Sequence, residues 1–91
     1  MMDRPDLFVI GRVLEGLVGG TLRRTQLQQR AGLNYTVFLR YLDYLVYLKL
    51  IAVQPDDESR LELTPKGMEA YRFLSEGLSQ IFGLPDPHRL H

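Results

Sequence analysis

The feature that most constrains the fold is a short break, Gly32-Leu33, between two stretches that both favour a helix. The stretch before it, residues 26–31, is short, and we expect Thr25 to cap its N-terminus and Gly32 to end it. Asn34 offers a second capping side chain, which opens a longer helix that runs to about Lys49. Two helices joined by so tight a turn form a helix-turn-helix unit.

The segment before this unit predicts one helix and a short extended link. Apolar side chains recur at helical spacing from about Asp6 to Val18, between Pro5 and the glycine pair at residues 19–20. The next three residues, Thr21–Arg23, are too few for a helix. We therefore expect an extended link or a strand of a single bridge there.

After residue 50 the sequence changes from helical to alternating periodicity. Residues 51–54 and 60–63 are typical of two strands joined by a polar tip over residues 55–59, which predicts a β-hairpin. Thr64-Pro65 then supplies a cap and a first-turn proline for a last helix, which runs to about Phe82. The predicted class is mainly α with a small β-hairpin (α+β), in the order helix, short strand, helix, helix, two strands, helix. This is the order of a winged helix.

Length and composition indicate a single domain. The chain has 91 residues, of which 45% are apolar, and we assign residues 1–84 to one domain and 85–91 to a frayed tail. There is no cysteine, which excludes disulfides and thiolate metal sites. Because the sequence shows neither a signal-peptide pattern nor the ~20 apolar residues of a membrane span, we expect a cytoplasmic protein without membrane contact.

Two short strings connect the chain to a known family. Residues 31–35 are AGLNY, residues 63–67 are LTPKG, and Tyr41-Leu42, Leu45 and Leu50-Ile51 lie between them. At these positions the sequence resembles the small winged helix-turn-helix regulators that are common in archaea, with more distant PadR-like and MarR-like relatives. The resemblance implies a winged-helix fold that binds double-stranded DNA, as a homodimer, and regulates transcription. It specifies no operator, effector or regulated gene.

The net charge is zero, but the charges are unevenly distributed. Residues 21–49 carry five basic side chains and one acid, whereas residues 50–91 carry seven acids and four bases. A basic middle favours an anionic partner for that part of the surface. The open alternative is a solvated face on which basic residues cluster by chance.

The helix that follows Asn34 has two different faces when its residues are placed at about 100° intervals. The apolar stripe that we expect to pack inward consists of Phe38, Leu42, Leu45 and the stem of Lys49. The opposite face, which enters the DNA major groove in a winged helix, carries Thr36, Arg40, Asp43 and Tyr47. Arg40 is the best candidate for reading a base, because its guanidinium can donate two hydrogen bonds to guanine. The alternatives are an arginine that is simply solvated and an ion pair between Arg40 and Asp43.

Further candidates for DNA contact lie at the starts of the two helices. Backbone N–H groups at the start of the 26–31 helix suit a phosphate, and the arginines just before it can hold the same DNA backbone. At the start of the longer helix, polar side chains can touch a phosphate or a thymine methyl, although capping can occupy Asn34. The full set of predicted DNA-binding residues is Arg23, Arg24, Thr25, Gln26, Asn34, Tyr35, Thr36, Arg40 and Arg60.

The hairpin tip departs from the usual DNA-binding pattern. DNA-binding wings present Arg or Lys to the minor groove, but this tip contains Asp56-Asp57-Glu58, and Arg60 is the one base nearby. Three carboxylates repel phosphates. We therefore expect the wing either to stay off DNA or to contact it through Arg60 alone.

The last helix carries an apolar stripe at the spacing of a helix–helix seam. Because a single small domain is too small to cover all of this apolar surface, we predict a homodimer through this helix. The predicted interface residues are Tyr71, Leu74, Leu78 and Ile81. The alternative is a stripe that belongs to the domain core.

Neither catalysis nor a cofactor or metal is expected from this sequence. Its two histidines, His88 and His91, lie in the predicted tail, and no glycine-rich phosphate loop is present. The rival interpretation is a winged-helix protein-interaction module that does not bind DNA. The acidic tip and the tyrosines at positions 44 and 47 favour this rival, because aromatic residues are enriched in protein interfaces.

Overall fold

The structure, a computed structural model, describes residues 4–82 and contains there four helices and a three-stranded antiparallel sheet. The order of elements confirms the predicted winged-helix class. The elements are α1 (Leu7–Gly16), β1 (Leu22–Arg23), α2 (Arg24–Ala31), α3 (Tyr35–Tyr47), β2 (Ile51–Gln54), β3 (Asp57–Leu63) and α4 (Pro65–Phe82). The predicted tail, residues 85–91, lies outside the described residues.

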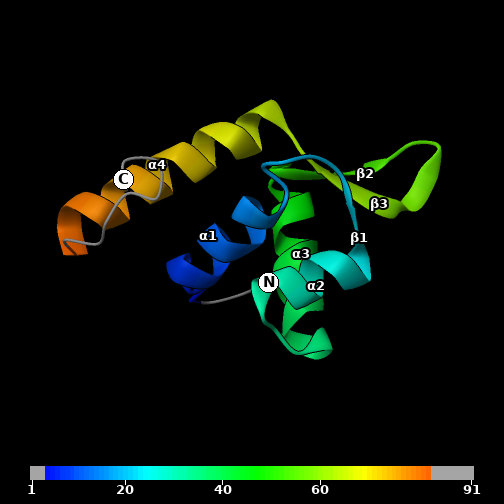
Figure 1. Cartoon of the computed structure of the whole chain (residues 1–91), viewed down its shortest axis with the longest axis horizontal. Helices are drawn as coiled ribbons and strands as arrows, with labels where there is room; N and C mark the ends of the chain where they lie inside the picture. Colours follow the sequence, from blue (N-terminus) through cyan, green and yellow to red (C-terminus); the bar gives the residue numbers. More distant parts are fainter. Residues whose placement is uncertain (1–3, 83–91) are drawn as a thin grey trace.

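The three N-terminal helices and the sheet share one apolar core. In Figure 1, α4 lies beside α1 and extends away from the core, and the β2–β3 hairpin projects at the opposite end of the molecule. The largest fully buried side chains are Val13, Leu14, Leu27, Phe38, Leu42, Leu45, Ile51 and Leu61. Three of them form the predicted inward stripe of α3, so this prediction is confirmed. The inclusion of Lys49 was wrong: α3 ends at Tyr47, and Lys49 is exposed with a left-handed φ of 62°.

The two long helices of the core begin at side-chain caps. Asn34 accepts a hydrogen bond from the backbone N–H of Val37 at 2.9 Å, which confirms its predicted capping role. At the start of α1, the carboxylate of Asp6 accepts from the N–H of Phe8 at 2.8 Å. The backbone N–H of Asp6 donates to the hydroxyl of Tyr41 at 3.0 Å. This last bond ties the start of α1 to the middle of α3, across 35 residues of chain.

The start of α2 differs from the prediction. Thr25 is not its N-cap, because the helix already begins at Arg24 and Arg23 is the capping residue. β1 runs directly into α2, and Arg23 keeps the extended backbone of the strand, with φ −75° and ψ 156°. At the other end, Gly32 closes the helix as predicted, with a φ of 68° that a residue without a side chain adopts most easily.

The sheet has the order β1-β3-β2, so β3 is its central strand. The predicted tip over residues 55–59 was too long, because β3 already begins at Asp57 and leaves only Pro55-Asp56 in the turn. The register with β2 shifts from Val53↔Leu61 to Gln54↔Asp57. Residues 58–60 are the extra residues of this irregularity, and such bulges redirect the side chains that they carry.

The end of α3 is joined to the start of α4 by a compact set of hydrogen bonds. Thr64 donates through its hydroxyl to the carbonyl of Lys49 at 2.6 Å and through its backbone N–H to the carbonyl of Leu50 at 3.1 Å. The ammonium of Lys66 donates to the carbonyl of Leu48 at 3.0 Å. The Thr64 hydroxyl also accepts from the N–H of Gly67 at 2.9 Å and so caps α4, as predicted. The α3–α4 junction, residues 48–50 with 64–67, thereby satisfies carbonyls that the end of a helix leaves free.

Gly67→Ala is expected to lower the free energy of unfolding by about 2–4 kcal/mol, because overpacking against backbone cannot be relieved by side-chain rotation. A Cβ at this position would meet the backbone carbonyl oxygen of Leu50 and, at 2.8 Å, the Cδ1 atom of Leu63. Urea denaturation measures the difference.

Gly77→Ala, in the same helix, is the matched control. Nothing lies within 4 Å of a Cβ added there, so the substitution should be neutral or stabilise by up to about 1 kcal/mol through helix propensity. Equal losses from the two substitutions would contradict the close approach at the α3–α4 junction.

Candidate nucleic-acid interface

The outward face of α3 is polar and open to solvent. Thr36, Arg40 and Asp43 are exposed, and 70% of Tyr47 is accessible, so the structure places these residues opposite the buried stripe as predicted. Among residues 4–82 the one ion pair joins Arg60 to Asp57. The alternative ion pair between Arg40 and Asp43 is therefore not formed, and the guanidinium of Arg40 is available to a ligand.

The first turn of α3 combines a structural role with free donors. The Oδ1 atom of Asn34 is occupied by its capping bond, which leaves the two N–H donors of its amide for another partner. Tyr35 is 49% exposed, and its ring centroid lies 6.5 Å from that of Phe38. Tyr35 is therefore a boundary residue, with one side on the core and the other in solvent.

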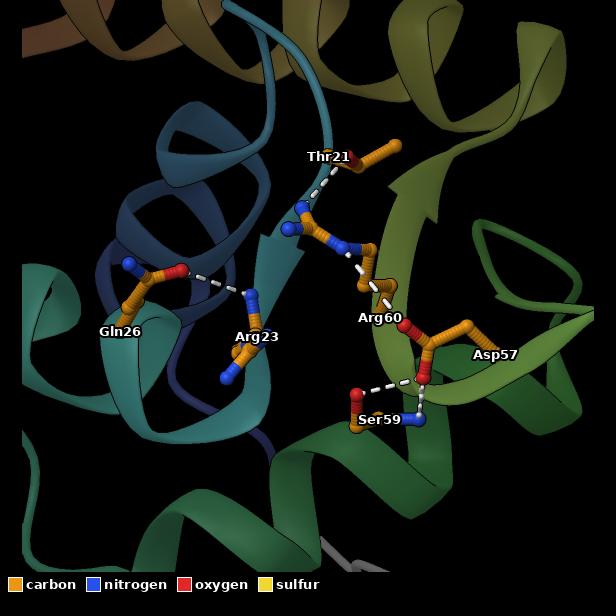
Figure 2. A network of polar contacts seen from close by, with 6 residues as sticks. All are labelled: Thr21, Arg23, Gln26, Asp57, Ser59 and Arg60. Atoms are coloured by element: carbon orange, nitrogen blue, oxygen red, sulfur yellow. Dashed lines mark hydrogen bonds and ion pairs between the residues drawn. The ribbon is translucent and has the colours of Figure 1, made fainter.

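The start of α2 contributes a second group of predicted contacts. Arg23, Thr25 and Gln26 are exposed and Arg24 is half-buried. Figure 2 shows that the side-chain oxygen of Gln26 accepts from the backbone N–H of Arg23, at 3.0 Å. This bond occupies one of the N–H groups that a phosphate could otherwise use, while the N–H₂ group of Gln26 keeps its donors.

Arg30, the remaining arginine of α2, faces another element. Its Nη1 atom donates to the carbonyl of Gly16 at the end of α1, at 3.4 Å. A cation near the last carbonyls of a helix is favourable. Arg30 thus stabilises the contact between α1 and α2.

The wing contains a polar network that the sequence did not predict. In Figure 2 the guanidinium of Arg60 lies between Thr21, which accepts from Nη1 at 3.3 Å, and Asp57, whose carboxylate lies 3.7 Å from Nε. The other carboxylate oxygen of Asp57 accepts from the backbone N–H of Ser59 at 3.0 Å and from its hydroxyl at 2.6 Å. Asp followed two residues later by Ser is a known signal for such local bonding, but the contact with Thr21 spans 39 residues and has no local signal.

The pKa of Asp57 is lowered by this network. The largest cause is the hydrogen bond from the Ser59 hydroxyl, followed by the bond from its backbone N–H and by the positive charges of Arg60 and Arg23. The ionised carboxylate therefore favours the folded wing, and this contribution is lost as the pH falls through the lowered pKa. Asp57 is thus held by the protein's own groups, whereas Asp56 and Glu58 are exposed at the tip.

The predicted dimer residues of α4 differ in how much surface they present. Tyr71 is 7% exposed and belongs to the domain core, and Leu74 is partly buried against that core. The side chains of Leu78 and Ile81 lie outside the part that the structure describes. Phe73 is 78% exposed on the same helix.

A family model described as winged helix-turn-helix matches residues 4–80. The chain belongs to this winged helix-turn-helix family. The match spans every element from α1 to most of α4, which include the α2–α3 unit and the wing. No curated protein sequence matches the chain significantly.

Solved structures with the same fold include a DNA-binding protein and a transcriptional regulator. The winged-helix chain is similar to Sso10a-2, a DNA-binding protein from Sulfolobus solfataricus, at 22% identity and a TM-score of 0.76, over 88% of this chain and 84% of that one. It is also similar to the PcaV transcriptional regulator from Streptomyces coelicolor, at 22% identity and a TM-score of 0.66, over 89% and 67% of the two chains. IdeR from T. acidophilum aligns at 18% identity and a TM-score of 0.57, over 93% of this chain and 43% of that protein.

Within the described residues, no helix of this winged-helix protein combines the length and the apolar character that a bilayer span requires.

Ser59→Ala is expected to raise the pKa of Asp57 toward the ordinary value of a carboxyl group, because it removes the hydroxyl donor and leaves the backbone N–H donor in place. An NMR pH titration that follows the Asp57 carboxyl carbon measures the shift. Ser75→Ala, on α4, is the control and should leave the pKa of Asp57 unchanged. An unchanged pKa in Ser59→Ala would mean that the hydroxyl does not bond to the carboxylate.

Proposed function

We propose that this protein binds double-stranded DNA as a homodimeric transcriptional regulator, with α3 in the major groove and without catalysis. The observation that carries the proposal is the outward face of α3, where Arg40 is exposed and unpaired within the described residues. The opposite face of the same helix is locked in the core by Phe38 and Leu42. A rigid helix with one open polar face is what major-groove recognition requires.

Arg40 is the proposed base-reading residue. Its guanidinium can donate two parallel hydrogen bonds to the O6 and N7 atoms of guanine. Thr36 lies about one turn earlier on the same face and can contact a phosphate or a thymine methyl. The free amide donors of Asn34 and the exposed side of Tyr35 extend this contact area at the start of the helix.

The start of α2 is the proposed region of phosphate contact. Arg23, Thr25 and Gln26 are exposed there, and Arg24 is partly accessible. Such contacts fix the position of a protein on the duplex and carry no sequence information. Sso10a-2, which is a DNA-binding protein, and PcaV, which is a transcriptional regulator, share the fold and support the proposal.

The proposed dimer forms through α4. This helix extends away from the core beside α1 (Figure 1), and the exposed ring of Phe73 is an apolar surface that a second copy can cover. We propose an interface of Leu74, Leu78, Ile81 and Phe73, with Tyr71 anchoring the helix to its own domain. A two-fold axis would then place the two α3 helices about 34 Å apart, one turn of DNA, or a multiple of it.

One observation favours the rival function of a protein-interaction module. Tyr47, at the end of α3, is 70% exposed, and Asp43, one turn earlier on the same face, forms no ion pair within residues 4–82. An aromatic residue in such a position suits a protein interface. The DNA titration below separates the two functions, because a module that has lost DNA binding shows no salt-dependent affinity for a duplex.

Arg40→Ala is expected to weaken binding by about 1–3 kcal/mol to a duplex selected from a random library, and to relax the sequence preference at one position. Fluorescence anisotropy at two salt concentrations measures the affinity, which should fall steeply with salt for the wild-type protein. Arg72→Ala, an exposed arginine on α4, is the matched control and should change little. Failure of the wild-type protein to bind any duplex at ~50 mM salt would favour the interaction module.

Phe73→Glu is expected to shift the protein from dimer to monomer, because it places a charge in the proposed apolar interface. Sedimentation at micromolar concentration should give twice the chain mass of 10.5 kDa for the wild type and a single chain mass for the variant. Tyr47→Glu makes the same kind of change on α3 and should leave the dimer intact. A wild-type monomer would contradict this part of the proposal.

A further inference from the structure

Arg23 and Arg60 face each other across the β1–β3 ladder, where the register pairs them directly. Side chains of directly opposed residues in an antiparallel pair lie on the same face of the sheet. Two like charges in this position destabilise the pairing unless a third group compensates them. The sequence separates these arginines by 37 positions, so only the folded sheet brings the two cations together.

Asp57 supplies a negative charge beside Arg60, with which it forms an ion pair. The irregular register of β3 places its carboxylate 3.7 Å from the Nε atom of Arg60, and the two donors of Ser59 hold it in that orientation (Figure 2). Both arginines act electrostatically on this carboxylate. Arg60 and Asp57 remain accessible, with side-chain exposures of 39% and 43%.

The contact between Asp57 and Arg60 leaves donors unused. A guanidinium has five N–H donors, and within the described residues Arg60 uses one of them in a hydrogen bond, to Thr21 at 3.3 Å. The separation of 3.7 Å from the Asp57 carboxylate is longer than a charge-assisted hydrogen bond, which is about 2.7–2.9 Å. A phosphate, which is not held in place by Ser59 as Asp57 is, can therefore approach Arg60 more closely.

We propose that Arg23, Arg60 and Thr21 form a seat for one phosphate of the DNA backbone, and that Asp57 occupies this seat in the free protein and competes with the phosphate. This inference rests on the proposed DNA-binding function. Because β1 continues directly into α2, the seat adjoins the residues that we propose for phosphate contact at the start of that helix. The wing thus meets DNA through its base, and its acidic tip lowers the affinity chiefly through one residue, Asp57.

The three acids near the tip allow competition by Asp57 to be distinguished from general electrostatic repulsion between the wing and DNA. Asp56, Asp57 and Glu58 are adjacent and carry the same charge, but only Asp57 belongs to the network with Arg60 among the described residues. Asp57→Asn removes the charge while keeping an oxygen that can accept from Ser59, so the local turn is retained. Asp56→Asn removes an equal charge from the neighbouring position and serves as the matched control.

The experiment measures the affinity of the full chain for a mixed-sequence DNA duplex by fluorescence anisotropy, at two salt concentrations. At ~0.1 M salt, Asp57→Asn is expected to bind the duplex about three- to tenfold more tightly than the wild type. The slope of log affinity against log salt concentration should also be steeper, by at most the contribution of one phosphate contact. Asp56→Asn should change the affinity by less than about twofold, since a solvated charge at the tip is largely screened. The Arg23→Gln/Arg60→Gln double variant has no guanidinium in the seat. In this background, Asp57→Asn should increase the affinity for DNA no more than Asp56→Asn does.

Two results would overturn the phosphate seat while leaving DNA binding intact. One is an equal gain in DNA affinity from Asp57→Asn and from Asp56→Asn. The other is a gain in affinity from Asp57→Asn that persists when Arg23 and Arg60 are both replaced by glutamine. If neither the wild type nor Asp57→Asn binds the duplex, the proposed function fails and the seat fails with it. Thermal unfolding of each variant, followed by circular dichroism, confirms that the compared proteins are folded.

Discussion

The hydrogen bonds of the α3–α4 junction are the constraint on which the geometry of this protein depends. Thr64 and Lys66 donate to three successive carbonyls at the end of α3, and the backbone of Gly67 lies against one of them. The junction therefore closes the wing, starts α4 and fixes the end of α3 at one place. Two of its donors are side chains, the Thr64 hydroxyl and the Lys66 ammonium, and one is the backbone N–H of Thr64. In a dimer built through α4, the same contacts would set the orientation of the two reading helices relative to the symmetry axis.

The sequence predicted the fold well because the relevant signals are local. Asn34 and Thr64 cap the helices that follow them, Gly32 adopts the left-handed turn, and the apolar period of α3 identifies its buried face. The LTPKG string at residues 63–67, which resembles winged helix-turn-helix regulators, has a physical role in the structure. Its threonine, lysine and glycine each contact the end of α3.

The sequence could not predict contacts that depend on the register of distant strands. The opposition of Arg23 and Arg60 requires β1 to pair with β3 across the whole helix-turn-helix unit, and the turn of Asp57 toward Arg60 depends on an irregular register. The predicted start of α2 was wrong for a related reason. The last residue of β1, Arg23, is also the N-cap of α2, so no residue separates the strand from the helix. From the sequence, Asp57 was one of three equivalent acids at a loop tip. In the structure it is a member of β3 and forms an ion pair with Arg60.

The protein is a winged helix in which one face of α3 is fixed by the core and the other is exposed to solvent. We propose that the exposed face binds DNA. The most direct test of this account is a map of backbone amide shifts in ¹⁵N-labelled protein as duplex DNA is added. The account predicts that the largest changes fall on the exposed face of α3 around Thr36 and Arg40, on the first turn of α2, and on Arg60. Changes confined to α1 and α4, or no changes with any duplex at low salt, would contradict it.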